Sequence, residues 1–291
     1  MLQPDIVFPE TIEEAIQALQ ARGAVVLGGA TDLIPAMQRG EVRPRLLVNL
    51  KHIAGLAGIR RVRGGTRVGA ATRVADLLHS ALIASHFPLL IEVAHGFASP
   101  QIRNLATIGG NLCNAAPSAD FALPLLVLDA RAEIHGRSGS RELDLASLFK
   151  GVNTTALRRG EILTAIHVPR MRLHTGAAYV KLGVRRSMDL ALASAAAALT
   201  LAPDRKTCRQ ARIALGAVAP IPKRTTTAEA VLEGKRLSPD LFAQAAAKAA
   251  ADSHPISDLR ASAGYRRQMV RVLVTRVLRE ALVRARKEPS R

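Results

Sequence analysis

The spacing of apolar residues at the start of the chain predicts a helix followed by buried strands. Residues 11–21 carry aliphatic side chains at helical spacing. Thr11, with Glu14 three residues later, is typical of a capping box at the start of that helix. The aliphatic runs 24–27 and 46–50 predict two strands. We therefore expect a compact βαβ-type unit that ends near residue 55.

From residue 59 the pattern changes to that of an antiparallel sheet with helices between its strands. Alternating residues around glycine turns predict hairpins at 59–70 and 132–143, and an apolar run at 162–168 predicts a further strand. Thr72 is placed to cap a helix, and residues 88–96 predict another. These elements form a second unit.

The last third of the chain has strands first and helices afterwards. Strands at 179–182, 191–201 and 211–216 predict a three-stranded antiparallel sheet. Helical spacing then predicts helices at 227–232, 241–251 and 265–286. A boundary near residues 170–177 divides the chain into units at 1–57, 58–172 and 173–291.

Composition excludes several classes of protein. The chain has 291 residues, 48% of them hydrophobic, and no apolar run is long enough to span a membrane. Its first residues lack the basic and apolar regions of a secretory signal, so we expect a cytoplasmic protein. The 2 cysteines, Cys113 and Cys208, and 8 scattered histidines predict no metal site.

The net charge of +18 raises the possibility of a nucleic-acid partner. Aromatic residues make up only 3% of the chain and there is no Trp, so few side chains could stack on bases. An acidic partner subunit or an anionic cofactor is a better explanation for part of this charge. A nucleotide- or nucleic-acid-binding module without flavin remains the alternative.

Two glycine pairs, about eighty residues apart, are the most informative chemical feature. Gly28-Gly29 follows the aliphatic run 24–27, and Gly109-Gly110 follows Ala106-Thr107-Ile108. Each pair is predicted to lie in a tight turn after a strand, where consecutive N–H groups can form a nest for phosphate oxygens. Two such turns predict a split site for a cofactor with a diphosphate bridge.

Longer motifs around these glycines carry a family resemblance. They are Gly28-Gly29-Ala30-Thr31-Asp32-Leu33-Ile34-Pro35, then Gln101 to Leu112, which contains Arg-Asn-Leu-Ala-Thr-Ile-Gly-Gly-Asn, then Ala116-Pro117-Ser118-Ala119-Asp120, and Tyr179-Val180-Lys181-Leu182 with Arg185-Arg186. With these motifs the chain resembles the FAD-binding medium subunit of the molybdenum hydroxylases, the family of carbon monoxide dehydrogenase and xanthine dehydrogenase. The resemblance implies an α+β fold: a two-subdomain FAD-binding unit of the vanillyl-alcohol-oxidase (PCMH) type, with subdomains at 1–57 and 58–172. A C-terminal domain of a small antiparallel sheet with helices would follow at 173–291.

The resemblance also implies which residues bind the cofactor. They are Leu27, Gly28, Gly29, Ala30, Thr31, Asp32, Leu33, Phe97, Thr107, Ile108, Gly109, Gly110, Asn111, Asp120, Leu163 and Lys181. Amides from 27 to 33 would line the ribityl–diphosphate, and Thr107 with the amides of 108–111 would hold its other side. Asp120 would accept a hydrogen bond from a sugar hydroxyl. Phe97 and Leu163 match positions near the adenine, and Lys181 matches one at the isoalloxazine.

Two departures from relatives concern the flavin itself. Ala30 stands where some relatives have His, so we expect FAD to be bound noncovalently. Leu190 follows Met188-Asp189, where several relatives place an aromatic residue against the isoalloxazine. The latter difference implies another flavin environment in this chain.

By resemblance, the chain is an electron-transfer subunit of an oxidoreductase. Electrons would reach its FAD from 2Fe-2S clusters on a small partner subunit, after substrate oxidation at molybdopterin on a large one. The FAD would pass them to NAD, oxygen or a quinone-linked carrier. No general acid, general base or nucleophile is assigned, and a heterotrimer or its dimer is expected. A flavin-free scaffold and a Rossmann domain are weaker alternatives, the second because no G-x-G-x-x-G follows a strand.

Overall fold

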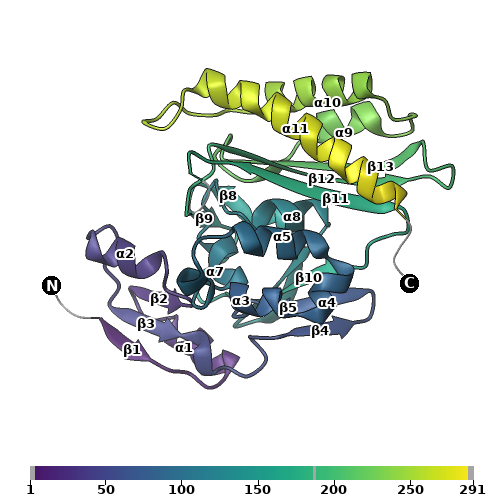
Figure 1. Cartoon of the computed structure of the whole chain (residues 1–291). Helices are drawn as coiled ribbons and strands as arrows, with labels where there is room; N and C mark the ends of the chain where they lie inside the picture. Colours follow the sequence, from purple (N-terminus) through teal and green to yellow (C-terminus); the bar gives the residue numbers. More distant parts are fainter. Residues whose placement is uncertain (1–3, 186–187, 288–291) are drawn as a thin grey trace.

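The computed structural model describes residues 4–185 and 188–287, so Arg186 of the family motif lies outside the described residues. Figure 1 shows a helix-covered sheet at the top, formed by the C-terminal third, above two units that contain the rest of the chain. The N-terminal unit lies beside the middle unit at the lower left.

The N-terminal unit is a three-stranded parallel sheet. Its strands are β1 (Asp5–Val7), β3 (Leu46–Asn49) and β2 (Ala24–Leu27), in that order. The helices are α1 (Ile12–Ala18) and α2 (Leu33–Gln38), and the 3-10 turn η1 spans Leu50–His52. Thr11 caps α1 as predicted, since its Oγ1 accepts from the Glu14 amide at 3.1 Å. The Glu14 carboxylate accepts from the amide of Glu10.

The middle unit is a five-stranded antiparallel sheet covered by short helices. The strand order is β4 (Ile59–Val62), β5 (Gly65–Gly69), β10 (Ile162–Pro169), β6 (Arg131–Gly136) and β7 (Gly139–Asp144). The helices are α3 (Val74–Leu78), α4 (Ala81–His86), α5 (Pro88–Gly96), α6 (Pro100–Arg103), α7 (Ile108–Cys113) and α8 (Ala122–Val127). The 3-10 turn η2 (Leu145–Ser147) and the small pair β8 (Phe149–Gly151) and β9 (Thr154–Thr155) complete it.

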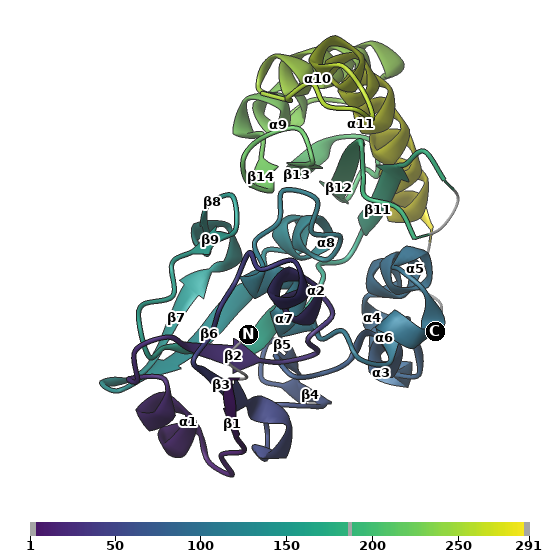
Figure 2. The same cartoon turned by 90° about the vertical axis from the view of Figure 1, so that its left-hand side faces the viewer.

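The C-terminal unit is a four-stranded antiparallel sheet with helices on one face. The strands are β11 (Thr175–Leu182), β12 (Ala193–Leu201), β13 (Cys208–Gly216) and the short β14 (Lys223–Arg224), in that order. The helices α9 (Thr226–Leu232), α10 (Pro239–Ala251) and α11 (Ala263–Arg286) cover its upper face in Figure 1. Its lower face packs on α8 and α5 of the middle unit. Figure 2 shows the same order of layers from the side.

Two local predictions were wrong. Thr72 does not cap a helix: α3 begins at Val74, and the Thr72 hydroxyl contacts the amide and carbonyl of Gly58 at 3.0 and 3.1 Å. The second glycine pair does not follow a strand; Gly109 and Gly110 lie inside the first turn of α7. The Thr107 hydroxyl caps that helix by accepting from the Gly110 amide at 3.0 Å, which makes a helix start the better interpretation of this motif.

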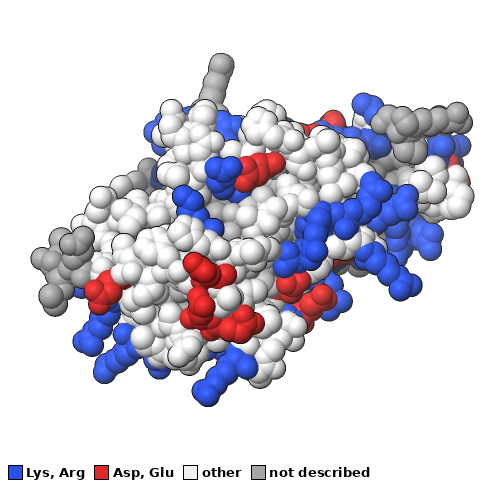
Figure 3. Space-filling view, turned by 90° about the horizontal axis from the view of Figure 1, so that it is seen from below, with Lys and Arg blue, Asp and Glu red and all other residues white. Residues whose placement is uncertain are grey.

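Charges of both signs lie on the lower face of the molecule. Figure 3 shows Lys and Arg side chains gathered towards one side of this face and a smaller group of Asp and Glu near its middle. On the five-stranded sheet, Glu133 pairs with Arg67 at 2.9 Å and with His167 at 2.7 Å. This face is therefore not uniformly basic. No helix in the described ranges is long and apolar enough to cross a membrane.

Candidate functional site

The two glycine segments meet in the folded chain. A Cβ added to Gly29 would lie 2.2 Å from the carbonyl oxygen of Leu105 and 2.8 Å from Cα of Ala106. One added to Gly28 would lie 3.4 Å from Oγ1 of Thr107. The first loop thus rests directly on the segment that enters α7, and the absence of a side chain at Gly29 permits this approach. The prediction of a single site split between two distant segments agrees with this geometry.

The first loop presents unused hydrogen-bond donors. The backbone N–H groups of Gly28 to Leu33 have no acceptor within the described part of the chain. Ala30 has a φ of 61°, in the left-handed region that bends the chain here. Unpaired amides of successive residues in such a bend form the kind of concavity that binds anions.

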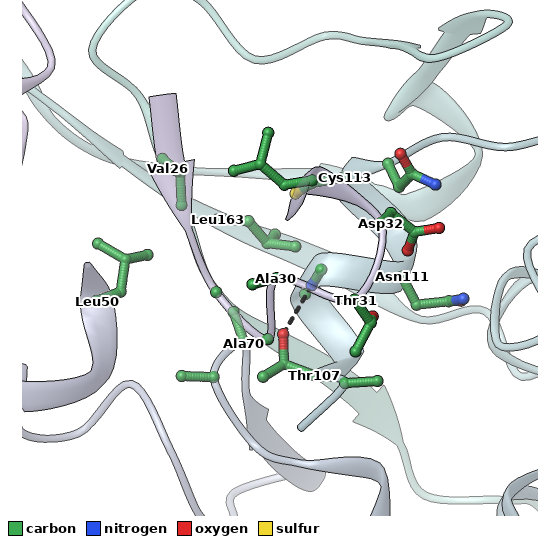
Figure 4. Close-up of a pocket in the computed structure, with 18 of the residues that line it drawn as sticks. Val26, Ala30, Thr31, Asp32, Leu50, Ala70, Thr107, Asn111, Cys113 and Leu163 are labelled. Atoms are coloured by element: carbon green, nitrogen blue, oxygen red, sulfur yellow. Dashed lines mark hydrogen bonds between the residues drawn. The ribbon is translucent and has the colours of Figure 1, made fainter. Parts of the chain in front are cut away.

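The second segment differs, because its amides already have partners. Ile108 N donates to Thr72 O at 3.0 Å, Gly109 N to Ala70 O at 2.8 Å and Asn111 N to Thr107 O at 3.0 Å. Gly110 N donates to the Thr107 hydroxyl, the bond drawn as a dashed line in Figure 4. The donors left in this segment are side-chain groups: the Thr107 hydroxyl and the Asn111 amide, whose oxygen accepts from Phe121 N at 3.2 Å.

A cavity of about 360 Å³ lies between the two segments. This volume is within the range of about 300–1,000 Å³ that is usual for small-molecule sites. Figure 4 shows Ala30, Thr31 and Asp32 on the first loop, and near them Thr107, which caps α7, and Asn111 on α7. Apolar side chains, among them those of Val26, Leu50 and Leu163, line the rest.

The charged groups of the cavity wall are carboxylates. Burial raises the pKa of Asp32, an effect that Arg39 partly offsets. Glu161 is held by Arg141 at 2.7 Å, and this hydrogen bond lowers the Glu161 pKa. Among the described residues no Lys or Arg lines the cavity. The Lys and Arg residues of the described ranges that give the chain its net positive charge therefore do not line this cavity. Backbone N–H groups and hydroxyl groups are the available partners for an anion.

Most of the residues named by the family resemblance line this cavity. They are Gly28, Gly29, Ala30, Thr31, Asp32, Leu33, Phe97, Thr107, Gly109, Gly110, Asn111 and Leu163. Leu27, Ile108, Asp120 and Lys181 are not among the lining residues. Leu27 and Ile108 adjoin lining residues in the chain. The role of each position in binding FAD stays a prediction.

Asp120 and Lys181 contact each other at the junction with the C-terminal sheet. Lys181 Nζ donates to Asp120 Oδ2 at 3.0 Å, and Tyr179 Oη donates to Asp120 Oδ1 at 2.8 Å. The resemblance implies that Asp120 binds a sugar hydroxyl and that Lys181 lies at the isoalloxazine end of the pocket; in the structure the two form an ion pair. Leu190, at the position of the missing aromatic residue, lines a separate cavity together with Pro117 and Ser118.

Several lining residues were missed from the sequence. Ala70, at the end of β5, fixes the start of α7 through its carbonyl, and Leu50 and Cys113 form part of the wall. These residues carry no distinctive motif, so no local signal could have identified them. Burial raises the pKa of the Cys113 thiol to about 12, which keeps it protonated. No group of His, Cys, Asp or Glu within the described ranges could hold a metal ion.

Two family descriptions match successive parts of the chain. Residues 2–171 match the FAD binding domain in molybdopterin dehydrogenase. Residues 178–281 match the CO dehydrogenase flavoprotein C-terminal domain.

Individual proteins are similar over nearly the whole chain. The xanthine dehydrogenase FAD-binding subunit of Escherichia coli O157:H7 is 34% identical over 94% of each chain, and the carbon monoxide dehydrogenase medium chain of Afipia carboxidovorans is 36% identical over 96% of each. In solved structures, a chain of carbon monoxide dehydrogenase from Hydrogenophaga pseudoflava has a TM-score of 0.94 at 32% identity, covering 97% of this chain and 98% of that one. A chain of quinoline 2-oxidoreductase from Pseudomonas putida 86 has a TM-score of 0.91 at 29% identity, covering 98% and 99%. The expected α+β architecture is confirmed by these matches.

Proposed function

The chain belongs to the family of FAD-binding medium subunits of the molybdenum hydroxylases, and from this premise we propose that it binds FAD noncovalently in the cavity between the loop 28–33 and α7 and transfers electrons through it. The relatives are subunits of oxidoreductases. None of them supports the nucleic-acid-binding alternative.

The observation that carries the proposal is the row of unpaired amides from Gly28 to Leu33. Gly28 and Asp32 are exposed and the other four residues are half-buried, so the row is open to an acceptor that the chain itself does not supply. The diphosphate of FAD supplies such oxygens. The Thr31 and Thr107 hydroxyls and the Asn111 side-chain amide add donors from the cavity wall.

The remaining wall offers FAD carboxylates and several apolar side chains. Asp32 lies on this wall, and a carboxylate beside a diphosphate is unfavourable. Its raised pKa makes the neutral, protonated form more accessible there than it would be in water. Apolar residues such as Leu50 and Leu163 provide surface for the ring systems. Phe97 lies on the wall and also contacts Phe121, with ring centroids 5.6 Å apart.

Noncovalent binding agrees with the nucleophiles available. The methyl group of Ala30 cannot attach to a flavin, and Cys113, the cysteine among the lining residues, is a thiol of high pKa. When bound, FAD supplies a centre that accepts and donates electrons, and the protein supplies its orientation and electrostatic surroundings. The chain's own part is to hold the diphosphate with the loop 28–33, to shield the rings with apolar side chains and to present this unit to partner subunits. We propose a large molybdopterin subunit and a small 2Fe-2S subunit as those partners, and the cytoplasm as their location.

The electron-transfer role is tested by anaerobic stopped-flow mixing of the FAD-loaded chain with a reduced 2Fe-2S partner subunit. We expect the absorbance of oxidised flavin to fall at a rate that increases with partner concentration. The same reductant without the partner serves as the control. Flavin that stays oxidised with the partner present would contradict electron transfer while leaving FAD binding intact.

A further inference from the structure

The face of the C-terminal sheet that packs on the middle unit is formed largely of alanine, apart from one polar group of side chains. Ala177, Ala196, Ala198 and Ala214 of this face belong to the core shared with the middle unit, and Tyr179 packs against that core. Lys181 lies two residues further along β11 and is opposite Ser194 of β12. Tyr179, Lys181 and Ser194, which we call the β11–β12 polar group, therefore share the face that is turned towards α8.

The β11–β12 polar group converges on Asp120, which belongs to the middle unit. Tyr179 donates to Oδ1 at 2.8 Å and Lys181 to Oδ2 at 3.0 Å. The Lys181 and Asp120 side chains are 18% and 12% exposed, so water screens this pair only weakly. Ser194 also forms a hydrogen bond with the Tyr179 hydroxyl. Burial and the Asp120 charge raise the pKa of Tyr179 well above its ordinary value, so that hydroxyl is a permanent donor.

A short path connects Asp120 with the wall of the candidate cofactor cavity. The next residue, Phe121, donates its amide to Asn111 Oδ1 at 3.2 Å and packs its ring on Phe97. Asn111 and Phe97 both line the cavity. Asp120 is therefore linked to two wall residues through its neighbour Phe121.

We infer that Tyr179 is a positioning residue of the cofactor site: its hydroxyl fixes Asp120 and, through the adjoining Phe121, the wall residues Asn111 and Phe97, and so makes the C-terminal sheet part of that site. This inference rests on the proposed function. A carboxylate has about four acceptor positions, so two remain open when Tyr179 and Lys181 occupy the others. Lys181 places a positive charge beside the Asp120 carboxylate, and Tyr179 fixes its direction.

The experiment is a double-substitution cycle on the full-length chain, read out as the dissociation constant for FAD from flavin fluorescence. Tyr179→Phe removes one oxygen and leaves the packing of the ring. Tyr265→Phe is the matched control, because Tyr265 is the other of the two tyrosines and is 44% exposed. Thermal unfolding of each FAD-free variant checks that it folds. The cycle is completed with Asp120→Asn alone and combined with Tyr179→Phe.

We expect Tyr179→Phe to weaken FAD binding about tenfold, as for loss of one hydrogen bond to an ionised group. Tyr265→Phe should leave the dissociation constant for FAD within about twofold of the parent value. In the Asp120→Asn background, Tyr179→Phe should also change that constant by less than about twofold. Equal FAD affinity of Tyr179→Phe and the parent would overturn the inference, as would a tenfold loss that persists in the Asp120→Asn background. If the parent and Tyr265→Phe both fail to bind FAD, the proposed function fails and this inference with it.

Discussion

The close contact of Gly29 with the segment before α7 gives the sharpest prediction. Replacing Gly29 by Ala would put a Cβ 2.2 Å from the carbonyl oxygen of Leu105 and 2.8 Å from its carbonyl carbon. An ordinary contact needs at least 3.4 Å, so the loop 28–33 and α7 must separate by about 1.2 Å (3.4 − 2.2). Both neighbours are backbone atoms and cannot rotate away as a side chain would.

That separation is large compared with the tolerance of a hydrogen bond. An N–H···O bond of about 2.9 Å that lengthens by this amount no longer counts as a bond. A cofactor held from both sides would keep its bonds to one segment and lose them to the other. Loss of two bonds to an ionised diphosphate, each contributing about 1.5–3 kcal/mol, corresponds to a decrease in FAD affinity of at least roughly a hundredfold. Overpacking should also destabilise the FAD-free protein by about 1–3 kcal/mol.

The assay is isothermal titration of the purified chain with FAD, together with urea unfolding. Gly96→Ala is the control, because a Cβ at Gly96 in α5 meets no atom within 4 Å. We expect the control to bind FAD normally and to be more stable by about 0.5–1 kcal/mol. Gly29→Ala with unchanged FAD affinity would refute the view that the two segments form one site.

Three further predictions concern other parts of the chain. Thr107→Ala should remove the cap of α7 and destabilise the FAD-free protein by about 1 kcal/mol in urea unfolding; unchanged stability would show that the Gly110 amide finds another acceptor. The Arg67 guanidinium, with His167, lowers the pKa of Glu133 from 4.5 to about 2, so this carboxylate stabilises the fold above pH 4.5 and loses that effect as the pH falls towards 2. The free energy of unfolding should therefore fall by about 1–3 kcal/mol more in the parent than in Glu133→Gln over that range, and parallel curves would contradict the assignment. Gly176→Ala should destabilise the protein by at least about 1–3 kcal/mol in urea unfolding, because its Cβ would lie 2.2 Å from backbone atoms of α11. A stability equal to that of the parent would show that β11 and α11 can move apart.

Much of the fold was predictable because local pattern and tertiary contacts agree. The capping box at Thr11 and the helix at 88–96 each combine a local signal with burial of one face. The apolar run at 191–201 contains the strand Ala193–Leu201, which is buried along its whole length. Thr72 failed as a cap because a hydroxyl in a loop can satisfy distant groups equally well, here the backbone of Gly58. Sequence spacing carries no information about such a distant partner.

The sequence predicted most of the residues that line the candidate site, but not which of their N–H groups are free to bind a ligand. Both Gly-Gly pairs suggested phosphate loops, yet the structure gives the pairs different tasks. Gly29 allows the first loop to rest on Leu105, while Gly109 lies against Ala70, with a Cβ position 2.7 Å from the Ala70 side chain. Bonds to Thr72 and Ala70 consume amides of the second segment, and these residues are far from the glycines in sequence. Only the folded chain shows which donors remain.

The pairing of Lys181 with Asp120 also could not be predicted from the sequence. The family motifs identified both, but in separate roles, because a motif records positions and not pairings. The contact between them depends on how the C-terminal sheet packs on the middle unit. The motif that contains Tyr179 therefore gives no indication of its contact with Asp120.

The most direct test of the central claim is the visible absorption spectrum of the purified chain after incubation with FAD and desalting, before and after acid precipitation. The account predicts a flavin spectrum at close to one FAD per chain, all of it released into the supernatant by acid. A chain that stays colourless, in isolation and when co-expressed with its partner subunits, would contradict the claim that this cavity binds FAD. Flavin that stays in the acid pellet would contradict noncovalent binding.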